Sequence, residues 1–484
     1  MTTLDHPARD DAAPGPVRIP FPVVDEVSRH CAQEEEPETV HIEVHLPGRL
    51  DPDRLRTAFV TALRAHPRIL MREAPGRWYR RRYEWELTEG PDVEVVAFPP
   101  AGPHALRDAR TRALVEAPPL TLSPPIRLEV VEGAGPAVGS EASDAVGLTP
   151  GGRAGGATAP RSAERQNPRP AAPGPGRPKG TVLFLTINHT ALDGPACLRI
   201  LATAAQLYGG EDNAPTAPPV RPPPPPAPDE PAPPEADTPS PWARPARVAA
   251  GTPEPSPGNG LLVTELPVPR RPKGAPYTVN DQLMVTTALT LAHWNREHGA
   301  HPRPLRITMP VDDRPRDTDM AIGNGTRLVE VAFHPAELRT DHTALPVLLR
   351  RTAERTRALK SLPRPQLGHG ASLLTAPVVP VSWRAAVTRG LRRAAAPWTS
   401  TTLLSNIGRI PYALDFGEEG GRAHAVWFSA PARMPRGLTV TTASTAGRLH
   451  VALRWSRALL SHGDGAHLRD LFEHYLHTTE EETR

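Results

Sequence analysis

The chain has 484 residues, of which 63 are proline and 37 are glycine, and aromatic residues make up only 5%. This length exceeds what one hydrophobic core usually organises, so we expect two domain-sized lobes, and the proline content predicts that part of the chain does not pack. The net charge is +3 and the arginines are dispersed among acids, which argues against nucleic acid as a partner.

The chain has two cysteines, Cys31 and Cys197. They lie too far apart for a disulfide framework and are too few for a structural zinc site, so we expect no metal. The first residues lack the apolar core of a signal peptide, and no later apolar run reaches the length of a membrane span. We therefore expect a cytoplasmic protein with no membrane partner.

Strand and helix patterns alternate along the first half of the chain. Residues 1–18 mix acids with prolines and are predicted to be disordered. Alternating apolar residues over 40–50 indicate a strand, and Asp51 then caps a helix in which Leu55 and Phe59 recur at helical spacing. The remaining predictions here are strands over 78–87, 93–98 and 126–132 and a helix over 104–117.

Two stretches interrupt this pattern. Residues 133–180 have almost no large apolar side chain, so they cannot offset their own ordering entropy and are predicted to form a disordered insert. Residues 211–260 contain a run of prolines that favours an extended conformation, and we interpret them as a linker. These assignments leave an N-terminal lobe over 19–210 and a C-terminal lobe over 261–484.

The second half repeats the mixed α/β character of the first. Its helix over 278–297 begins at Thr278, which we interpret as a cap. Strands and helices in both halves predict an α/β (α+β) fold. The other predicted elements are strands over 261–268, 305–313, 326–333, 401–408, 424–430, 437–445 and 448–455 and helices over 343–362 and 467–477.

The residues that carry chemistry follow a strongly apolar strand over 181–187 and precede a helix over 195–208. Such a strand delivers His189 rigidly to the edge of a sheet. Gly194 permits a tight turn, and the helix that begins there offers unpaired N–H groups to an anion. Three residues separate His189 from Asp193, which suits an aspartate that anchors the turn through an arginine, so we interpret Asp193 as structural.

The string from Asn188 to Gly194 resembles the His-His-x-x-x-Asp-Gly motif of condensation domains and of the wider chloramphenicol-acetyltransferase-like acyltransferases. His189 matches the second histidine of the motif, and Asn188 replaces the first, where it can still donate a structural hydrogen bond. Five further segments resemble parts of the same family, namely 46–67, 124–132, 278–289, 309–315 followed by 322–324, and 403–410.

This resemblance implies a fold of two chloramphenicol-acetyltransferase-like lobes in a V shape, with His189 in a tunnel between them. A donor thioester would enter from one face and a nucleophile from the other. By the same resemblance, Arg314 pairs with Asp193, and Gly194 places a backbone N–H near the developing oxyanion. Ser405 and Asn406 are expected to line the path of the acyl group or the acceptor.

The function implied by the resemblance is that of a metal-independent acyltransferase with His189 as general base. The acyl group would come from a phosphopantetheine thioester, either coenzyme A or a carrier protein, and would pass to an amine or alcohol acceptor. We expect no tightly held cofactor and a monomer. Natural-product biosynthesis, such as that of nonribosomal peptides or antibiotics, is the expected setting.

Two other functions stay open. One is a catalytically silent condensation-like domain that binds a carrier protein or partner enzyme, which Asn188 suggests. The other is a lipid-directed acyltransferase that makes wax esters or acylglycerols, which the pair Asn280 and Asp281 suggests. Against this second alternative, we find no amphipathic basic helix of the kind that lies on membranes.

Structural interpretations compete with several of these assignments. His189 could be an ordinary histidine at a strand end, and Asp193 and Gly194 could be a common Asp-Gly turn. His293 and Trp294 are interpreted as packing residues of their helix. For Trp427 and Phe428 the sequence leaves both a core position and a tunnel wall open.

Overall fold

The computed structural model describes residues 16–32, 36–133, 180–216, 239–240, 242–314, 322–338, 345–361 and 371–481. Most of the predicted disordered segment over 1–18, all of the predicted insert over 133–180 except its two end residues, and the centre of the predicted linker over 211–260 lie outside these residues. For those parts of the chain the predictions stay predictions.

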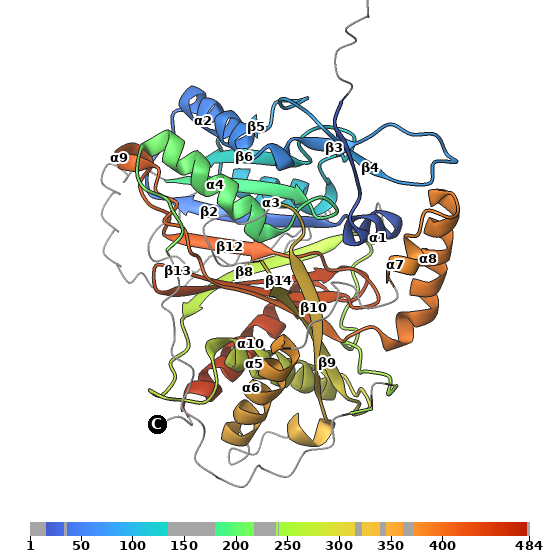
Figure 1. The fold of residues 1–484 in the computed structure, drawn as a ribbon. Coiled ribbons are helices and arrows are strands. Elements are labelled where there is room, and N and C mark those ends of the chain that lie inside the picture. Colours follow the sequence, from blue (N-terminus) through green and yellow to red (C-terminus); the bar gives the residue numbers. More distant parts are fainter. Residues whose placement is uncertain are drawn as a thin grey trace, which may run out of the picture.

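The first sheet has five strands in the order β12-β2-β7-β6-β5. Its central strands β2 and β7 are buried at every residue because helices cover both faces. The helices α2 and α4 pack on one face and α3 packs on the other (Figure 1). The bounds are β2 Thr39–Leu46, β5 Val96–Ala97, β6 Ile126–Glu132, β7 Thr181–Asn188, β12 Ala425–Ser429, α2 Pro52–Ala65, α3 Ala105–Val115 and α4 Gly194–Gly209.

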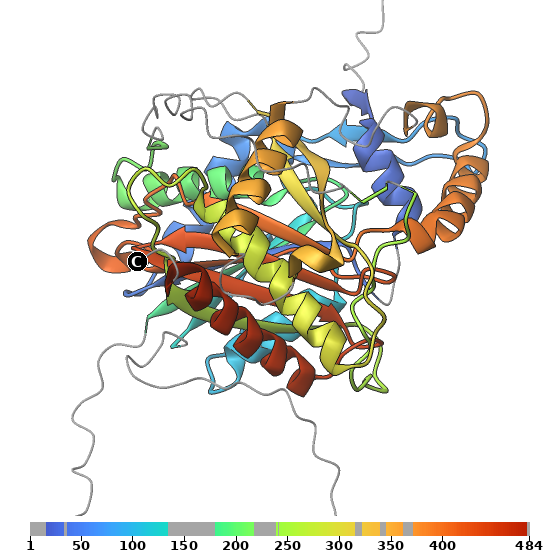
Figure 2. The same cartoon turned by 90° about the horizontal axis from the view of Figure 1, so that it is seen from below.

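The second sheet has six strands in the order β10-β9-β11-β13-β14-β8. The helices α5, α6 and α10 cover its outer face, as the view from below shows (Figure 2). Thr278 caps α5 in a capping box with Asp281, which confirms the predicted cap. The bounds are β8 Asn259–Pro267, β9 Leu305–Asp312, β10 Thr326–Phe333, β11 Thr402–Arg409, β13 Leu438–Thr445, β14 Arg448–Ser456, α5 Val279–Glu297, α6 Leu345–Ser361 and α10 His462–Glu481.

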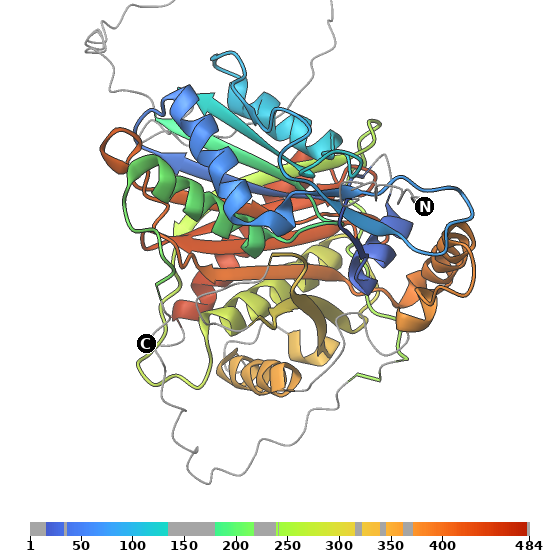
Figure 3. The ribbon, with the colours of Figure 1, turned by 45° about the horizontal axis from the view of Figure 1, so that its top comes forward.

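A third, smaller layer lies at one end of the molecule (Figure 3). It contains a three-stranded sheet in the order β1-β4-β3 and a pair of packed helices, α1 and α8. Arg384 of α8 donates to Glu26 of α1 at 2.6 Å, and both side chains are buried. The bounds are β1 Arg18–Pro20, β3 Met71–Glu73, β4 Glu84–Leu87, α1 Val23–Cys31, α7 Ala371–Leu374 and α8 Val381–Ala395. The short helix α9, Gly417–Gly420, lies apart from this layer, beside α4.

The two large sheets are tied together through strand β12. The sequence places this segment in the C-terminal lobe, but β12 pairs antiparallel with β2, so Val426 lies opposite Val44. Arg454 of β14 provides a second link between the two sheets. Its buried guanidinium donates to the carbonyl oxygens of Pro37 and Thr39, at the start of β2. The lobes therefore share strands and hydrogen bonds across their junction.

Several predicted elements differ in length from the observed ones. The strand predicted over 78–87 begins only at Glu84, because the arginine-rich residues before it form a turn, and the strand predicted over 93–98 shrinks to Val96–Ala97. Part of the predicted linker is packed, since Ala246 and Val248 are buried against the second lobe. The helices α1 and α8 were not predicted at all.

Candidate active site

The strand β7 carries the motif residues to the junction between the two large sheets. It pairs with β6 on one side as far as Ile187 and with β2 on the other side to its end, where Asn188 lies opposite Thr39. The chain then turns through His189 and enters α4, for which Asp193 is the N-cap. The His189 N–H donates to the carbonyl oxygen of Glu38 at 2.9 Å, which fixes the turn to the neighbouring strand.

The imidazole of His189 is held by a single backbone contact. Its Nδ1 lies 3.0 Å from the carbonyl oxygen of Leu192. Because a carbonyl oxygen can only accept a hydrogen bond, Nδ1 carries the proton, and Nε2 is left as the basic nitrogen. His189 also lines a cavity at the junction of the two large sheets, where its ring can contact a bound molecule.

The expected ion pair between Asp193 and Arg314 is present. The Arg314 Nη2 donates to Asp193 Oδ2 at 2.6 Å, and the two side chains are only 5% and 4% exposed. The other carboxylate oxygen of Asp193 accepts the N–H of Ala196, which caps α4. Asp193 therefore points away from the imidazole of His189 and anchors the turn, as the sequence predicts.

Three residues that the sequence analysis did not single out complete this anchor. The Gly325 N–H donates to Asp193 Oδ2 at 3.0 Å. The Asn324 side chain donates to the carbonyl oxygens of His189 and Thr190 at 3.3 and 3.2 Å and to Asp25 Oδ1 at 2.9 Å. Asn324 belongs to the segment over 322–324 noted in the sequence, but Asp25 of α1 carries no local signal.

Asp25 is a buried carboxyl group directly behind the motif turn. It accepts hydrogen bonds from Asn324 and from the indole Nε1 of Trp85, at 2.9 Å each. Burial raises the pKa of Asp25 from 3.8 to about 7, because desolvation outweighs these two hydrogen bonds. The charge behind the turn therefore changes in the neutral pH range.

Asn188 and Gly194 occupy the two ends of the motif. The Asn188 side chain donates to the carbonyl oxygen of Pro118 at 2.9 Å and accepts the Thr190 N–H at 3.1 Å, so its role here is structural. In the first turn of α4, Ala196 and Cys197 donate their N–H groups to Asp193, and Pro195 has none. Gly194 itself is one of the residues that line the cavity.

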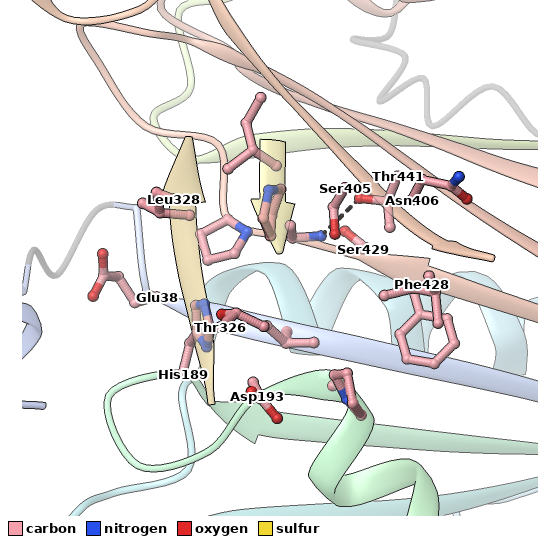
Figure 4. A pocket seen from close by; sticks show the side chains of 18 of the residues that line it. Glu38, His189, Asp193, Thr326, Leu328, Ser405, Asn406, Phe428, Ser429 and Thr441 are labelled. Carbon is pink, nitrogen blue, oxygen red and sulfur yellow. Dashed lines mark hydrogen bonds between the residues drawn. The ribbon is translucent and has the colours of Figure 1, made fainter. Parts of the chain in front are cut away.

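The cavity beside His189 has a volume of about 310 Å³. Its lower wall is formed by the motif turn and its upper wall by strands of the second sheet, which carry Ser405, Asn406 and Thr441 (Figure 4). The structure thus brings both predicted substrate-path residues to the cavity. Asn406 is held by Asn280, whose Oδ1 accepts from its Nδ2 at 3.2 Å.

One end of the cavity is cationic, and no sequence pattern pointed to it. Arg433 pairs there with the carboxylate of Glu38 and donates to the carbonyl oxygen of Cys31. Arg436 donates to the hydroxyl groups of Ser400 at 3.0 Å and Thr308 at 3.4 Å, and the carboxyl group of Glu330 interacts with its charge. Burial lowers the pKa of Arg436 from 12.5 to about 10, so it keeps its charge at neutral pH.

The remaining candidates lie outside the reacting region or in its walls. Trp294 is buried and donates to the Ala249 carbonyl oxygen, and His293 contacts Tyr475, so both are packing residues as interpreted. Phe428 is 3% exposed in the core of the first lobe and also lines the cavity, so it holds both of the positions that the sequence left open. Burial raises the pKa of the Cys197 thiol well above its usual value, so this thiol is poorly suited to act as a nucleophile.

The described residues contain neither a metal-binding cluster nor a membrane-spanning helix. Within them, no group of three or more His, Cys, Asp or Glu side chains is arranged to hold a metal ion. None of the helices in the same part of the chain is both long and apolar enough to cross a bilayer.

Sequence comparisons place the chain near proteins of unknown role. No protein-family model matches it. Two uncharacterized proteins of Mycobacterium tuberculosis, Rv2305 and MT2362, are each 26% identical to it over 423 residues, which is 82% of this chain and 84% of each relative.

Comparisons with solved structures are more informative about the fold. The trichothecene 15-O-acetyltransferase TRI3 from Fusarium sporotrichioides is similar at a TM-score of 0.58, with 12% identity over 96% of both chains. A mutant of the starter condensation domain of rhizomide synthetase RzmA was solved with C8-CoA and Leu-SNAC. It is similar at a TM-score of 0.56, with 12% identity, over 95% of this chain and 93% of that one. The condensation domain of the monacolin K polyketide synthase MokA is similar at a TM-score of 0.55, with 12% identity, over 96% of this chain and 97% of that one.

These similarities span nearly the whole chain. They show that it has the mixed α/β fold shared by condensation domains and chloramphenicol-acetyltransferase-like acyltransferases, as the sequence resemblance implies. At 12% identity the similarity establishes the fold and leaves the chemistry to be argued from the site itself.

Proposed function

We propose that this protein is an acyltransferase that moves an acyl group from a thioester to an amine or hydroxyl acceptor. The observation that carries the proposal is the state of His189, whose Nδ1 is tied to the Leu192 carbonyl oxygen while its ring lines the cavity at the junction of the two sheets. A fixed neutral imidazole with a free basic nitrogen is the arrangement that general-base catalysis requires.

In the proposed reaction, Nε2 of His189 accepts the proton of the acceptor O–H or N–H while the acceptor attacks the thioester carbonyl carbon. The carbonyl oxygen becomes an oxyanion in the tetrahedral intermediate, and in this proposal the Gly194 N–H at the start of α4 donates to it. Collapse breaks the C–S bond, and the leaving thiolate takes the proton from the imidazolium. The products are an ester or amide and a thiol, and no acyl-enzyme is required.

The ion pair between Asp193 and Arg314 serves this reaction indirectly. It holds the turn whose carbonyl oxygen, from Leu192, orients the imidazole. General-base catalysis typically contributes about 10² to 10⁴ in rate, so positioning of the two substrates must supply much of the remainder. Asp193 and Arg314 are positioning residues in this mechanism and do not touch the reacting atoms.

The proposed donor is a phosphopantetheine thioester, carried by coenzyme A or by a carrier protein. The structurally similar RzmA domain was solved with C8-CoA and Leu-SNAC, which supports a thioester donor for this chain as well. Synthesis of a natural product is the proposed setting. The protein is proposed to need no metal and to act as a monomer.

The experiment that tests the proposal is intact-mass detection of acyl transfer. A panel of acyl-coenzyme A and acyl-carrier thioesters is offered with amine and alcohol acceptors, including long-chain alcohols. His189→Ala is compared with His104→Ala, which alters an exposed histidine outside the cavity. We expect transfer by the wild type and by His104→Ala, and a loss of about 100-fold or more in His189→Ala.

Two outcomes would contradict the proposal. Transfer that is equal in His189→Ala and the wild type would remove His189 from the mechanism. No transfer by the wild type across the panel would favour a catalytically silent domain that binds a carrier protein. Preference for long-chain alcohols would instead keep the mechanism and assign the substrates to the lipid-directed class.

A further inference from the structure

The helix α8 presents a stripe of large apolar side chains to the outside of the molecule. Trp383, Val387 and Leu391 recur every four residues on one face and are 66%, 55% and 51% exposed. The opposite face is buried against α1 and includes Arg384 and Thr388. The exposed stripe is therefore not needed for the packing of α8 onto the fold.

Two neighbouring segments extend this apolar surface. The loop before β4 exposes Trp78 and Tyr79, and it is joined to the start of α8 by the Val381 N–H, which donates to the Arg80 carbonyl oxygen at 2.9 Å. Figures 1 and 3 show this loop beside α8 at the outer edge of the molecule. With α7 and the loop after it, this corner holds eight of the sixteen exposed large apolar side chains of the described residues: Trp78, Tyr79, Leu373, Val378, Val379, Trp383, Val387 and Leu391.

The charge of the same surface is positive. Arg389 and Arg393 of α8 are exposed, and so are Arg81 and Arg82 in the loop before β4. The sequence contains no aspartate or glutamate from Ala371 to Leu414. A protruding helix with an apolar stripe, tryptophan on it and arginines beside it is the pattern of a helix that lies in the interface of an anionic membrane.

We propose that this corner, formed by residues 77–82, 371–379 and α8, docks the protein on the surface of a bilayer that contains anionic lipid. The apolar side chains would insert among the acyl chains, and the arginines would contact the lipid phosphates. A bilayer fits better than an acidic protein, because the large apolar side chains protrude from an outer edge of the molecule. The open hollow beside them is lined by Arg80, Arg81, Arg82, Glu84 and Pro377 and by none of these apolar side chains, so it is not an apolar groove for a partner segment. This proposal departs from the sequence-based expectations of no basic amphipathic helix and no membrane partner.

This surface lies close to the cationic end of the cavity. Arg392 of α8 donates to the carbonyl oxygens of Cys31 and Met434, and Arg433 donates to the same Cys31 oxygen from the cavity side. Docking would therefore bring one end of the cavity near the lipid surface. The docking proposal does not rest on the proposed acyl transfer, because it concerns residues outside the cavity.

The experiment is flotation of the full-length protein with vesicles of phosphatidylcholine, with and without phosphatidylglycerol. The test variant carries Trp383→Ser, Val387→Ser and Leu391→Ser. The control carries Trp242→Ser, Val115→Ser and Leu207→Ser, which removes one tryptophan, one valine and one leucine that are exposed elsewhere. Circular dichroism and thermal unfolding verify that all proteins are folded.

We expect the wild type and the control to float with the phosphatidylglycerol vesicles and to bind pure phosphatidylcholine weakly. The test variant should lose about tenfold or more in partition coefficient. A further variant with Arg389→Gln and Arg393→Gln should lose the preference for phosphatidylglycerol and the sensitivity to salt.

Absence of flotation by the wild type would overturn the docking proposal, as would equal flotation of the test and control variants. Retention of the wild type on beads coated with polyglutamate, together with no flotation, would assign the surface to an acidic polypeptide instead. Loss of acyl transfer in His189→Ala with intact flotation would separate the two proposals from each other.

Discussion

At the scale of single residues, the buried ion pair between Asp193 and Arg314 is the contact on which the motif turn depends. Replacing Asp193 by Asn keeps a good N-cap for α4 but removes the buried one of the two carboxylates that pair with Arg314, and leaves Asp312 at 3.2 Å from its Nη1. We expect Asp193→Asn to lower the free energy of unfolding by about 1 to 3 kcal/mol and to reduce acyl transfer. Urea denaturation and the transfer assay measure the two effects.

The exposed ion pair between Arg448 and Glu265 provides the control, because its side chains are 45% and 39% exposed. Glu265→Gln should change the free energy of unfolding by less than about 1 kcal/mol. Equal costs for the two substitutions would contradict the special role assigned to the buried pair.

The raised pKa of Asp25 predicts a specific dependence of stability on pH. Its folded-state pKa of about 7 lies above its ordinary value of 3.8, so the folded protein binds this proton more tightly than the unfolded chain. Asp25 therefore destabilises the fold above pH 7, and this effect disappears as the pH falls toward 4. The full effect corresponds to a few kcal/mol, on the order of 4.

The comparison of Asp25→Asn with the wild type isolates this effect. The variant should gain stability relative to the wild type as the pH rises from about 4 to about 8. Urea midpoints measured across this range give the difference, and Asp470→Asn on the exposed face of α10 is the control. A difference that does not change with pH would mean that Asp25 is not protonated in the folded state near neutrality.

The sequence predicts part of the site and leaves the rest out for a physical reason. His189, Asp193 and Gly194 sit within one strand-turn-helix segment, so their arrangement follows from local structure, and Arg314 was found through its resemblance to a family segment. Asp25 and the cationic end of the cavity depend on packing between distant segments. Nothing in their neighbouring residues indicates that they meet the motif turn.

At the scale of elements, the start of β10 is adapted to the Arg314 side chain. A Cβ atom added at Gly325 would lie 2.4 Å from Nε and Cζ of Arg314. Because Arg314 is pinned by Asp193, it cannot move aside without breaking the ion pair. Gly325→Ala should therefore cost about 1 to 3 kcal/mol of stability and lower the rate of transfer.

Two comparisons test that reasoning. Gly90→Ala places its Cβ in open space and should be close to neutral. In a background that already carries Arg314→Ala, the cost of Gly325→Ala should largely vanish, because the clashing side chain is gone. An unchanged loss of stability in that background would mean that Gly325→Ala acts through the backbone and not through a clash with the Arg314 side chain.

Whether a segment forms a helix or a strand was easier to predict from the sequence than which other segment it packs against. The strand over 126–132 and the helix that follows Thr278 have strong periodicity, and both are present. The helix α8 escaped prediction because its large apolar side chains are exposed while its buried face carries Arg384 and Thr388, which is the reverse of the usual pattern for a packed helix. The pairing of β12 with β2 is set by the distant sheet edge and could not be read from the strand itself.

At the scale of the whole molecule, the contacts across the junction argue that the two lobes unfold together. β12 completes the first sheet, and the Trp427 indole of this strand donates to the Thr264 carbonyl oxygen of β8 in the second sheet. Arg454 adds hydrogen bonds to Thr39 from the opposite side. A division of the chain into independent lobes would leave these groups without partners.

The connection between β6 and β7 allows a test of how much of the chain the fold requires. The two strands pair antiparallel until Glu132 lies opposite Thr181, and the Gly133 N–H donates to the Gly180 carbonyl oxygen at 3.1 Å. The ends of the predicted insert are thus already at the spacing of a hairpin. A two-residue Asn-Gly turn is the standard connection for such a pair of strands.

Replacing residues 134–179 by Asn-Gly should therefore leave the fold and the transfer activity intact. It should raise the free energy of unfolding by about 1 to 2 kcal/mol, because a shorter loop costs less entropy to close. Urea denaturation and the transfer assay on the full-length and shortened proteins measure both quantities. Loss of stability in the shortened protein would show that the insert makes contacts with the fold, and loss of transfer alone would show that it takes part in binding the donor or the acceptor.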